Sequence, residues 1–304
     1  MPTRTPRRDV RGLLLLDKPG GMTSNRALQR VKHLFQAAKA GHTGSLDPLA
    51  TGMLPICFGA ATSVCAYLLD SHKAYRVVAT LGAATDTGDA DGTVVSTSDA
   101  EPAAPDAVAA ALRRFVGTIE QVPPMYSALK REGVRLYELA RRGVSVPREP
   151  RTVVIESLRL EAYRWPELAF TVRCSKGTYV RSLVEDLARA LGTLGHVREL
   201  RRLYVDPFAD APMVEIEALE ASAAEGGLVA LDGHLLPLDR ALPTWPVVPV
   251  SADGAERLAH GQALTAEPDW PLGRVRVYAP PGELLALGEV SADRRLVPLR
   301  VFGR

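Results

Sequence analysis

Asp47 has the most unusual surroundings of any acidic residue in this 304-residue chain. It lies in segment 41–52, Gly-His-Thr-Gly-Ser-Leu-Asp-Pro-Leu-Ala-Thr-Gly, and no Lys or Arg occurs within seven positions on either side. Glycines let a ligand approach the backbone closely, and hydroxyl groups and backbone amides can keep a carboxylate ionised. The segment is therefore a candidate loop for presenting one carboxylate to a substrate, although Asp-Pro beside Gly and Ser is also typical of an ordinary turn.

Sequence motifs for other common chemistries are missing. No Gly-Lys-Ser/Thr follows the glycines as in a P-loop, no Gly-x-Gly-x-x-Gly follows a predicted strand, and no Gly-x-Ser-x-Gly elbow occurs. The histidines show neither HxxxH nor HxxEH spacing, so we predict no metal and no cofactor. They are His33, His42, His72, His196, His234 and His260. Among the chemistries considered, the one that these absences leave is a reaction carried by a single carboxylate, without a metal or a cofactor.

The formal net charge of +2 hides a strong separation of charge along the chain. Residues 18–46 contain five basic and no acidic residues, and residues 130–151 and 173–202 each contain seven basic against three acidic residues. Segments 86–106 and 215–239 each carry six acidic residues and no Lys or Arg. Such a pattern can build a basic face for a polyanion, or it can reflect solvated helix faces.

Hydrophobic periodicity predicts the elements that must position Asp47. Ser24 or Asn25 is expected to cap a helix with apolar residues at helical spacing up to Ala38. Apolar runs and alternation predict strands at 13–16, 74–81, 153–160 and 168–174, and helical spacing predicts helices at 108–117 and 183–191. Residues 121–150, bounded by prolines and rich in basic residues, are expected to leave the body of the fold.

A Pro-rich linker at 243–249 precedes three short predicted strands at 274–278, 284–290 and 296–302. Strands and helices mix without strict alternation, so the expected fold class is α+β. No apolar run approaches the roughly 18 residues of a membrane span, and the run behind the basic start, which includes Arg4, Arg7, Arg8 and Arg11, is too short for an export signal. We therefore expect no membrane association, a cytoplasmic location, and reduced cysteines at Cys57, Cys65 and Cys174.

Five ordered motifs resemble those of the bacterial tRNA pseudouridine-55 synthases, the TruB family. The first is Gly-Leu-Leu-Leu-Leu-Asp-Lys-Pro-Gly-Gly-Met-Thr-Ser at 12–24, and the second is the Asp47 loop extended to residue 56. The others are Lys-Ala-Tyr-Arg at 73–76, Gln-Val-Pro-Pro-Met-Tyr-Ser-Ala-Leu-Lys at 121–130 and Cys-Ser-Lys-Gly-Thr-Tyr-Val-Arg-Ser-Leu-Val-Glu-Asp at 174–186. The segment after the linker resembles a PUA domain, which is an RNA-binding β module.

The resemblance implies a catalytic domain at 1–245 with a thumb-like insertion at 121–150, and a PUA-like RNA-binding domain at 246–304. The catalytic domain would hold a central mixed, mostly antiparallel sheet flanked by helices. The implied activity is isomerisation of uridine 55 in the tRNA T-loop to pseudouridine after the base is flipped out, without a cofactor. The implied partner is the T-arm of tRNA, with no guide RNA, and the enzyme is expected to be a monomer.

The resemblance also implies roles for individual residues. Asp47 is the expected catalytic carboxylate, Arg181 its partner, and Tyr75 the ring that stacks on the uracil. Whether Asp47 attacks C6, attacks C1′ or removes the 2′ proton stays open. The other implied substrate contacts are Tyr179 and Leu200 in the uracil pocket, His42 in the gap left by the flipped base, Lys18 as a support or phosphate contact, and the thumb residues Lys130, Arg131, Arg135, Arg141 and Arg142 against phosphates.

Two other functions fit parts of the same sequence. A non-catalytic tRNA-binding protein or folding chaperone would use the same basic segments and the C-terminal module. A hydrolase of nucleoside N-glycosidic bonds would also use a carboxylate, but the Asp47 loop offers no second well-placed carboxylate for it.

Overall fold

The structure is a computed structural model that describes residues 7–302, so Arg4 of the basic start lies outside the described residues. One large sheet runs through the body of the molecule in the order β13-β1-β3-β12-β4-β11-β10-β7, with β2 paired to β3. Its strands are β1 (Gly12–Lys18), β2 (Ala40–His42), β3 (Thr51–Phe58), β4 (Lys73–Leu81), β7 (Gly117–Gln121), β10 (Arg151–Arg164), β11 (Glu167–Cys174), β12 (Gly195–Val205) and β13 (Val214–Glu215). The β1–β13 and β3–β12 pairs are parallel and the other pairs are antiparallel, which confirms the mixed, mostly antiparallel sheet.

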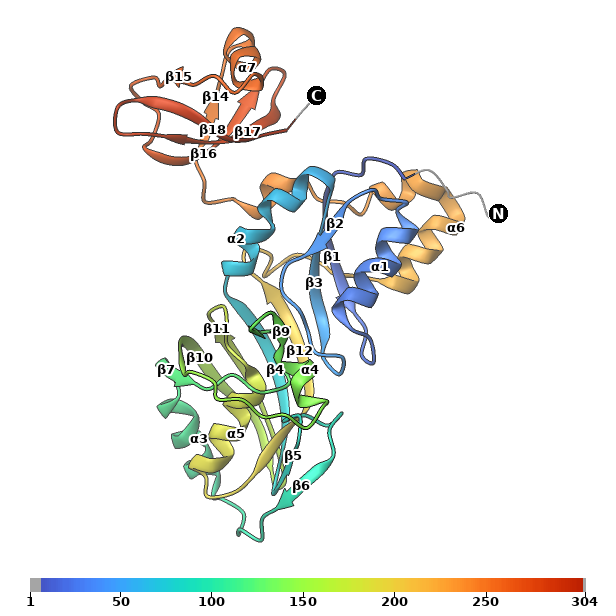
Figure 1. Ribbon diagram of the computed structural model, residues 1–304, viewed down its shortest axis with the longest axis vertical. Coiled ribbons are helices and arrows are strands. Elements are labelled where there is room, and N and C mark those ends of the chain that lie inside the picture. The colour runs from blue at the N-terminus through green and yellow to red at the C-terminus, as the bar shows by residue number, and fades with distance from the viewer. Residues whose placement is uncertain (1–6, 303–304) are drawn as a thin grey trace.

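Helices cover the two ends of this sheet separately (Figure 1). The described helices of the body are α1 (Ser24–Leu34), η1 (Gly59–Val64), α2 (Cys65–Asp70), α3 (Pro105–Arg114), α4 (Leu136–Ala140), α5 (Val180–Ala190), α6 (Ile216–Asp232) and η2 (Leu238–Ala241). The apolar faces of α1 and α6 pack on β1 and β3, whereas α3 and α5 pack on β4, β11 and β12. The α+β class is therefore confirmed.

The first helix corrects one sequence prediction. Its N-cap is Thr23, whose Oγ1 accepts a hydrogen bond from the amide of Arg26 at 3.2 Å, and not Ser24 or Asn25. Ser24 already has helical hydrogen bonding and is buried. The helix ends at Leu34, before the predicted Ala38, because Gln36 takes a positive φ of 51°.

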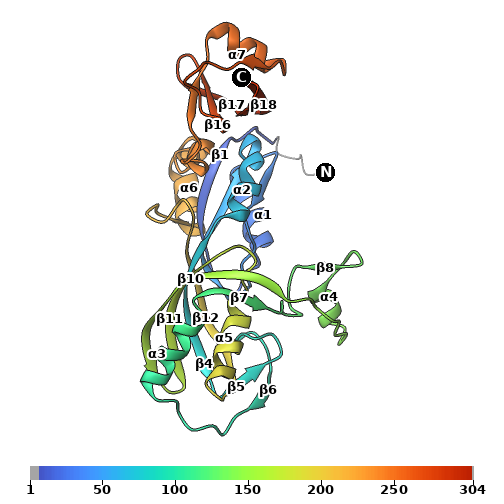
Figure 2. The same ribbon diagram turned by 90° about the vertical axis from the view of Figure 1, so that its left-hand side faces the viewer.

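A hairpin arm projects from the body between β7 and β10 (Figure 2). It contains β8 (Lys130–Arg131), β9 (Val134–Arg135) and the short helix α4. A second small hairpin, made of β5 (Ala83–Thr85) and β6 (Val94–Thr97), frames a loop rich in aspartate that packs on β12. Both additions lie at the end of the body that carries α5.

The C-terminal segment forms a separate β module with its own apolar core (Figure 1). Its strand order is β14-β16-β17-β18-β15, and helix α7 (Ala252–Ala259) covers it. The strands are β14 (Val247–Pro249), β15 (Leu264–Thr265), β16 (Gly273–Ala279), β17 (Glu283–Val290) and β18 (Arg295–Val301). The last residues of the predicted linker thus form a strand, because Val247 to Pro249 pair in parallel with β16.

Aromatic and basic side chains join the module to the body. The rings of Tyr67 and Trp245 meet edge to face at 4.9 Å, and the guanidinium of Arg274 lies 5.3 Å from the Tyr67 ring centroid. Leu287 and Phe302 of the module also pack in the apolar cluster beneath β1 and β3. No described helix is long and apolar enough to cross a membrane.

Candidate active site

The Asp47 loop lies beside the short parallel pairing of β3 with β12 in the large sheet. It connects β2 to β3, and the start of β3 pairs with β12 through Thr51 and Gly52. Gly52 has a φ of +97°, and a Cβ atom there would lie 2.1 Å from the carbonyl oxygen of Arg202. Only glycine permits this approach, which brings the loop against the strands that carry Tyr75 and Leu200.

Asp47 and Arg181, which are 134 positions apart, form a two-point ion pair. Arg181 Nε lies 2.9 Å from Asp47 Oδ2, and Arg181 Nη2 donates to Asp47 Oδ1 at 3.2 Å. The Arg181 side chain is 4% exposed and the Asp47 side chain 37% exposed. Burial raises the pKa of the Asp47 carboxyl, and the positive charge of Arg181 is the largest influence that opposes this rise. The pair therefore orients the carboxylate and leaves one side of it accessible.

The guanidinium of Arg181 also connects two other segments to the site. It donates to the carbonyl oxygens of Thr87 and Tyr126, each at 2.7 Å. Its Nε lies 3.8 Å from Oδ2 of Asp89, a buried carboxylate that accepts a hydrogen bond from Thr87 Oγ1 at 2.6 Å. Arg181 thus joins the Asp47 loop, the aspartate-rich loop and the base of the hairpin arm.

Tyr75, Leu200 and Tyr179 lie on the elements around this pair. Tyr75 on β4 and Leu200 on β12 belong to the same buried cluster as Leu46. Burial raises the pKa of the Tyr75 hydroxyl, so it stays protonated at neutral pH. Tyr179 directly precedes α5, and Gln121 holds its backbone by accepting from its amide at 3.0 Å and donating to its carbonyl at 3.3 Å.

His42 and Lys18 lie on β2 and β1, which both pair with β3. His42 ends β2 and is partly exposed, and burial together with the charge of Arg202 lowers its pKa. Lys18 is fully buried, and its ammonium donates to the carbonyls of Pro19, Met22 and Pro48 at 2.7, 2.6 and 3.4 Å.

The prediction for Lys18 needs a correction. A side chain without exposed surface cannot reach an RNA phosphate, so the supporting role fits this structure and the phosphate contact does not. Burial lowers the pKa of Lys18 to about 8. The cost of burying the ammonium is offset by the three carbonyl oxygens that it bonds.

Sequence reasoning missed Arg202, the largest side chain among those that are almost fully buried. Its Nε donates to the carbonyl of Met53 at 2.6 Å and its Nη2 to the carbonyl of Gly44 at 3.1 Å, so it spans both ends of the Asp47 loop. Arg202 is also the cross-strand partner of Tyr75. The sequence did contain a signal for Arg202. Residues two apart on a strand share a face, and Leu200, two positions before Arg202, was already predicted to line the uracil pocket.

The predicted phosphate contacts lie apart from this cluster. Lys130, Arg141 and Arg142 are exposed on the hairpin arm, which the ribbon shows extending away from the sheet (Figure 2). On the same arm, the guanidinium groups of Arg135 and Arg141 lie 5.9 and 5.5 Å from the ring centroid of Tyr137. The arm therefore exposes three basic side chains on its surface.

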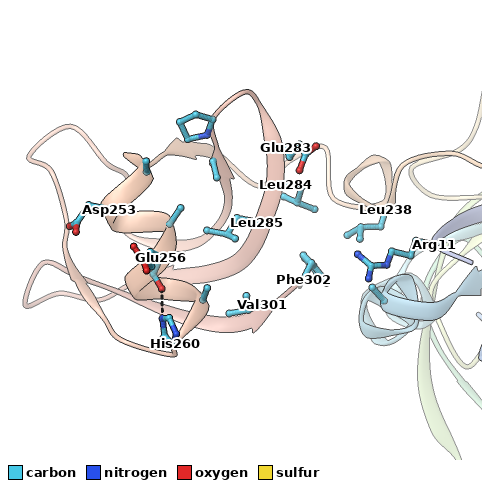
Figure 3. Close-up of a pocket in the computed structure, with 16 residues that line it drawn as sticks. Arg11, Leu238, Asp253, Glu256, His260, Glu283, Leu284, Leu285, Val301 and Phe302 are labelled. Carbon is cyan, nitrogen blue, oxygen red and sulfur yellow. Dashed lines mark hydrogen bonds between the residues drawn. The ribbon is translucent and has the colours of Figure 1, made fainter. Parts of the chain in front are cut away.

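A separate cavity lies away from Asp47. It has a volume of about 950 Å³ and opens between α7 of the module and the body near Arg11 and Leu238 (Figure 3). Asp253, Glu256 and Glu283 line it, and carboxylates repel a phosphate backbone. Within residues 7–302, no group of three or more His, Cys, Asp or Glu side chains is placed to hold a metal ion.

Known domains match three consecutive parts of the chain. Residues 32–180 match the TruB family pseudouridylate synthase N-terminal domain, residues 181–243 the tRNA pseudouridylate synthase B C-terminal domain, and residues 246–302 the Pseudouridine synthase II TruB C-terminal domain. A solved Cbf5-Nop10-Gar1 complex contains a chain that superposes with a TM-score of 0.71 and 25% identity, covering 96% of this chain and 84% of that one. The domain matches and the fold thus define a pseudouridine synthase with a PUA-like module.

Curated relatives narrow this class to one family. A protein of Pseudomonas putida strain F1 is 52% identical over 297 residues, which cover 97% of each chain, and is named tRNA pseudouridine synthase B. A protein of the same name from Pseudomonas aeruginosa strain UCBPP-PA14 is 50% identical, again with 97% of each chain covered. The chain belongs to the TruB family of pseudouridylate synthases.

Proposed function

We propose that this chain converts the uridine at position 55 in the T-loop of tRNA to pseudouridine, with Asp47 as the catalytic carboxylate. In this reaction the bond from N1 of the base to C1′ of the ribose breaks, and a bond from C5 to C1′ forms. The base gains a proton at N1 and loses one from C5, so no atoms are gained or lost overall. The observation that carries the proposal is the two-point pairing of a partly exposed Asp47 with a buried Arg181.

The reacting base is stacked inside folded RNA, so the enzyme must flip it out at a cost of a few kcal/mol. Stacking on an aromatic ring can return about 1–3 kcal/mol per base. We assign this stacking to Tyr75, and we assign Tyr179 and Leu200 to the walls of the uracil pocket. His42, whose lowered pKa leaves it neutral, is assigned to the space that the base vacates.

We further propose that the enzyme binds the T-arm directly, without a guide RNA and as a monomer, in the cytoplasm where tRNA is available. The exposed thumb residues Lys130, Arg141 and Arg142 support this assignment because phosphate contacts of this kind need no guide. Residues 1–245 would then form the catalytic domain with its thumb at 121–150, and residues 246–304 an RNA-binding domain.

The decisive experiment incubates the purified protein with an unmodified tRNA transcript and maps pseudouridine by mass spectrometry. We expect one new pseudouridine, at position 55, and no free uracil. Asp47→Asn keeps the size of the side chain and removes its charge, so it should abolish the product while tRNA binding persists. Unmodified RNA after incubation with the parent protein would instead favour the folding chaperone, and released uracil would favour a hydrolase.

A further inference from the structure

Ser24 makes contacts that its position at the start of α1 does not require. Thr23 already caps the helix, so the Ser24 hydroxyl is available for another partner. Ser24 is 3% exposed, and its Oγ accepts a hydrogen bond from the amide of Leu46 at 2.7 Å and donates one to the carbonyl of Leu46 at 3.1 Å. One hydroxyl therefore satisfies both backbone polar groups of the residue that precedes Asp47.

The backbone around Asp47 is fixed at several points, and Ser24 supplies the nearest one on the N-terminal side. Lys18 bonds the carbonyl of Pro48, the residue after Asp47, at 3.4 Å. The amide of Ala50 donates to the carbonyl of Asp47 at 3.1 Å and closes a turn. Because Leu46 and Pro48 are both tied to the segment 18–24, the Cα–Cβ direction of Asp47 is set by that segment.

We propose that Ser24 is a positioning residue, which aims the Asp47 carboxylate at Arg181 and at the base by fixing the backbone of Leu46. The proposal rests on the proposed role of Asp47. Ser24 itself is too deeply buried to touch the RNA, so its effect reaches the reaction only through the loop. Without the hydroxyl, the buried amide and carbonyl of Leu46 lose their partner, and the loop must shift to find others.

The test compares Ser24→Ala with the matched control Thr23→Ala. Each variant removes one hydroxyl from the same turn, but within residues 7–302 the Thr23 hydroxyl bonds only the amide of Arg26, in the exposed N-cap. We expect Ser24→Ala to lower the single-turnover rate of pseudouridine formation about 10- to 100-fold, as a misplacement of a reacting group near 1 Å can do. We expect its tRNA dissociation constant to stay within about twofold of the parent value and Thr23→Ala to leave the rate within about twofold.

The pH profile separates positioning from a loss of folded protein. Pairing with Arg181 lowers the pKa of Asp47. If the pair is loosened, the acidic limb of the pH–rate profile, where the rate falls as Asp47 is protonated, should move to higher pH. A smaller folded fraction would reduce the amplitude of turnover and leave that limb in place. Ser24→Thr keeps the hydroxyl and should recover most of the rate if the protein melts near the parent temperature.

Equal rates for Ser24→Ala and Thr23→Ala would overturn the positioning role, and so would an unchanged acidic limb in a slow Ser24→Ala variant. These results differ from a failure of the proposed function. In that case the parent protein would form no pseudouridine, or Asp47→Asn would remain active, regardless of residue 24.

Discussion

Replacing Arg181 by lysine tests the geometry of the site most directly. Lysine keeps the positive charge but offers one nitrogen in place of the planar guanidinium. In the parent protein that guanidinium reaches both carboxylate oxygens of Asp47 and the carbonyls of Thr87 and Tyr126. A single ammonium cannot occupy these positions together, so at least one hydrogen bond to Asp47 or to the two loops cannot form.

The expected magnitude follows from the hydrogen bonds that lysine cannot make. A hydrogen bond to a charged group contributes about 1.5–3 kcal/mol, which corresponds to a rate lower by about 10- to 150-fold if the bond to Asp47 is the one that breaks. Unpartnered, partly buried carbonyls at Thr87 and Tyr126 should lower the free energy of unfolding by about 1–3 kcal/mol. The tRNA affinity should change little, because the Arg181 side chain is 4% exposed.

The pH at which the rate falls on the acidic side of the pH–rate profile is a second, independent measure of the pairing between Asp47 and Arg181. Under the proposed function the ionised Asp47 carboxylate carries the reaction, so activity should be lost as the pH falls through the pKa of Asp47. Burial places that pKa above the ordinary value of 3.8, and removing the two-point pair should raise it further. The limb of Arg181→Lys should therefore lie at higher pH than that of the parent enzyme.

Single-turnover assays of tritium release from tRNA labelled at uridine C5, run from pH 4 to pH 9, measure the rate and the limb together. Filter binding gives the dissociation constant, and thermal melting gives the stability. If tRNA affinity fell as much as the rate, Arg181 would be a binding residue and not the partner of Asp47. A limb that stayed at the parent pH would likewise refute the pairing argument.

Three further predictions concern other parts of the molecule. Tyr75→Phe should retain more tRNA affinity than activity if the hydroxyl moves a proton, and comparable losses in filter binding and turnover would reject that role. Alanine at Lys130, Arg141 and Arg142 together should reduce the slope of log affinity against log salt by about 2–3, and an unchanged slope would remove the thumb from the phosphate interface. Truncation after Thr244 should weaken tRNA binding while some turnover survives, and a folded but inactive truncation would contradict the domain division.

Much of the fold was predictable because its strands and helices carry simple periodic patterns. The strand at 74–81 and the helix at 183–191 are seen as β4 and α5, with small shifts at their ends. Helix α6 was not predicted, since Gly226 and Gly227 interrupt its pattern and Gly227 has a positive φ of 62°. Strand β14 was assigned to the linker because two of its residues lie beside prolines, and only pairing with β16 makes it a strand.

Side-chain partners were less predictable, because competing hydrogen bonds decide them and the competitors come from distant segments. Thr23 and Ser24 are both good helix caps by residue type. The Leu46 backbone, 22 residues from Ser24, decides which of them caps the helix and which holds the loop. Lys18 is similar, because an exposed turn lysine and a buried one have the same local sequence.

The cations buried around Asp47 share one feature that bears on the chemistry. Lys18, Lys73 and Arg202 all donate to backbone carbonyls in this structure, and carbonyl dipoles solvate a cation without cancelling its charge. Their field therefore remains positive around the loop, where the charge of Lys18 lowers the pKa of Asp47 and that of Arg202 lowers the pKa of Tyr75. Burial acts against the ionised form of Asp47, and under the proposed function bound RNA would add to this burial. Under the proposed function, a fixed cation such as Lys18, which the substrate cannot displace, would keep opposing the rise in the pKa of Asp47 when the RNA excludes water from the site.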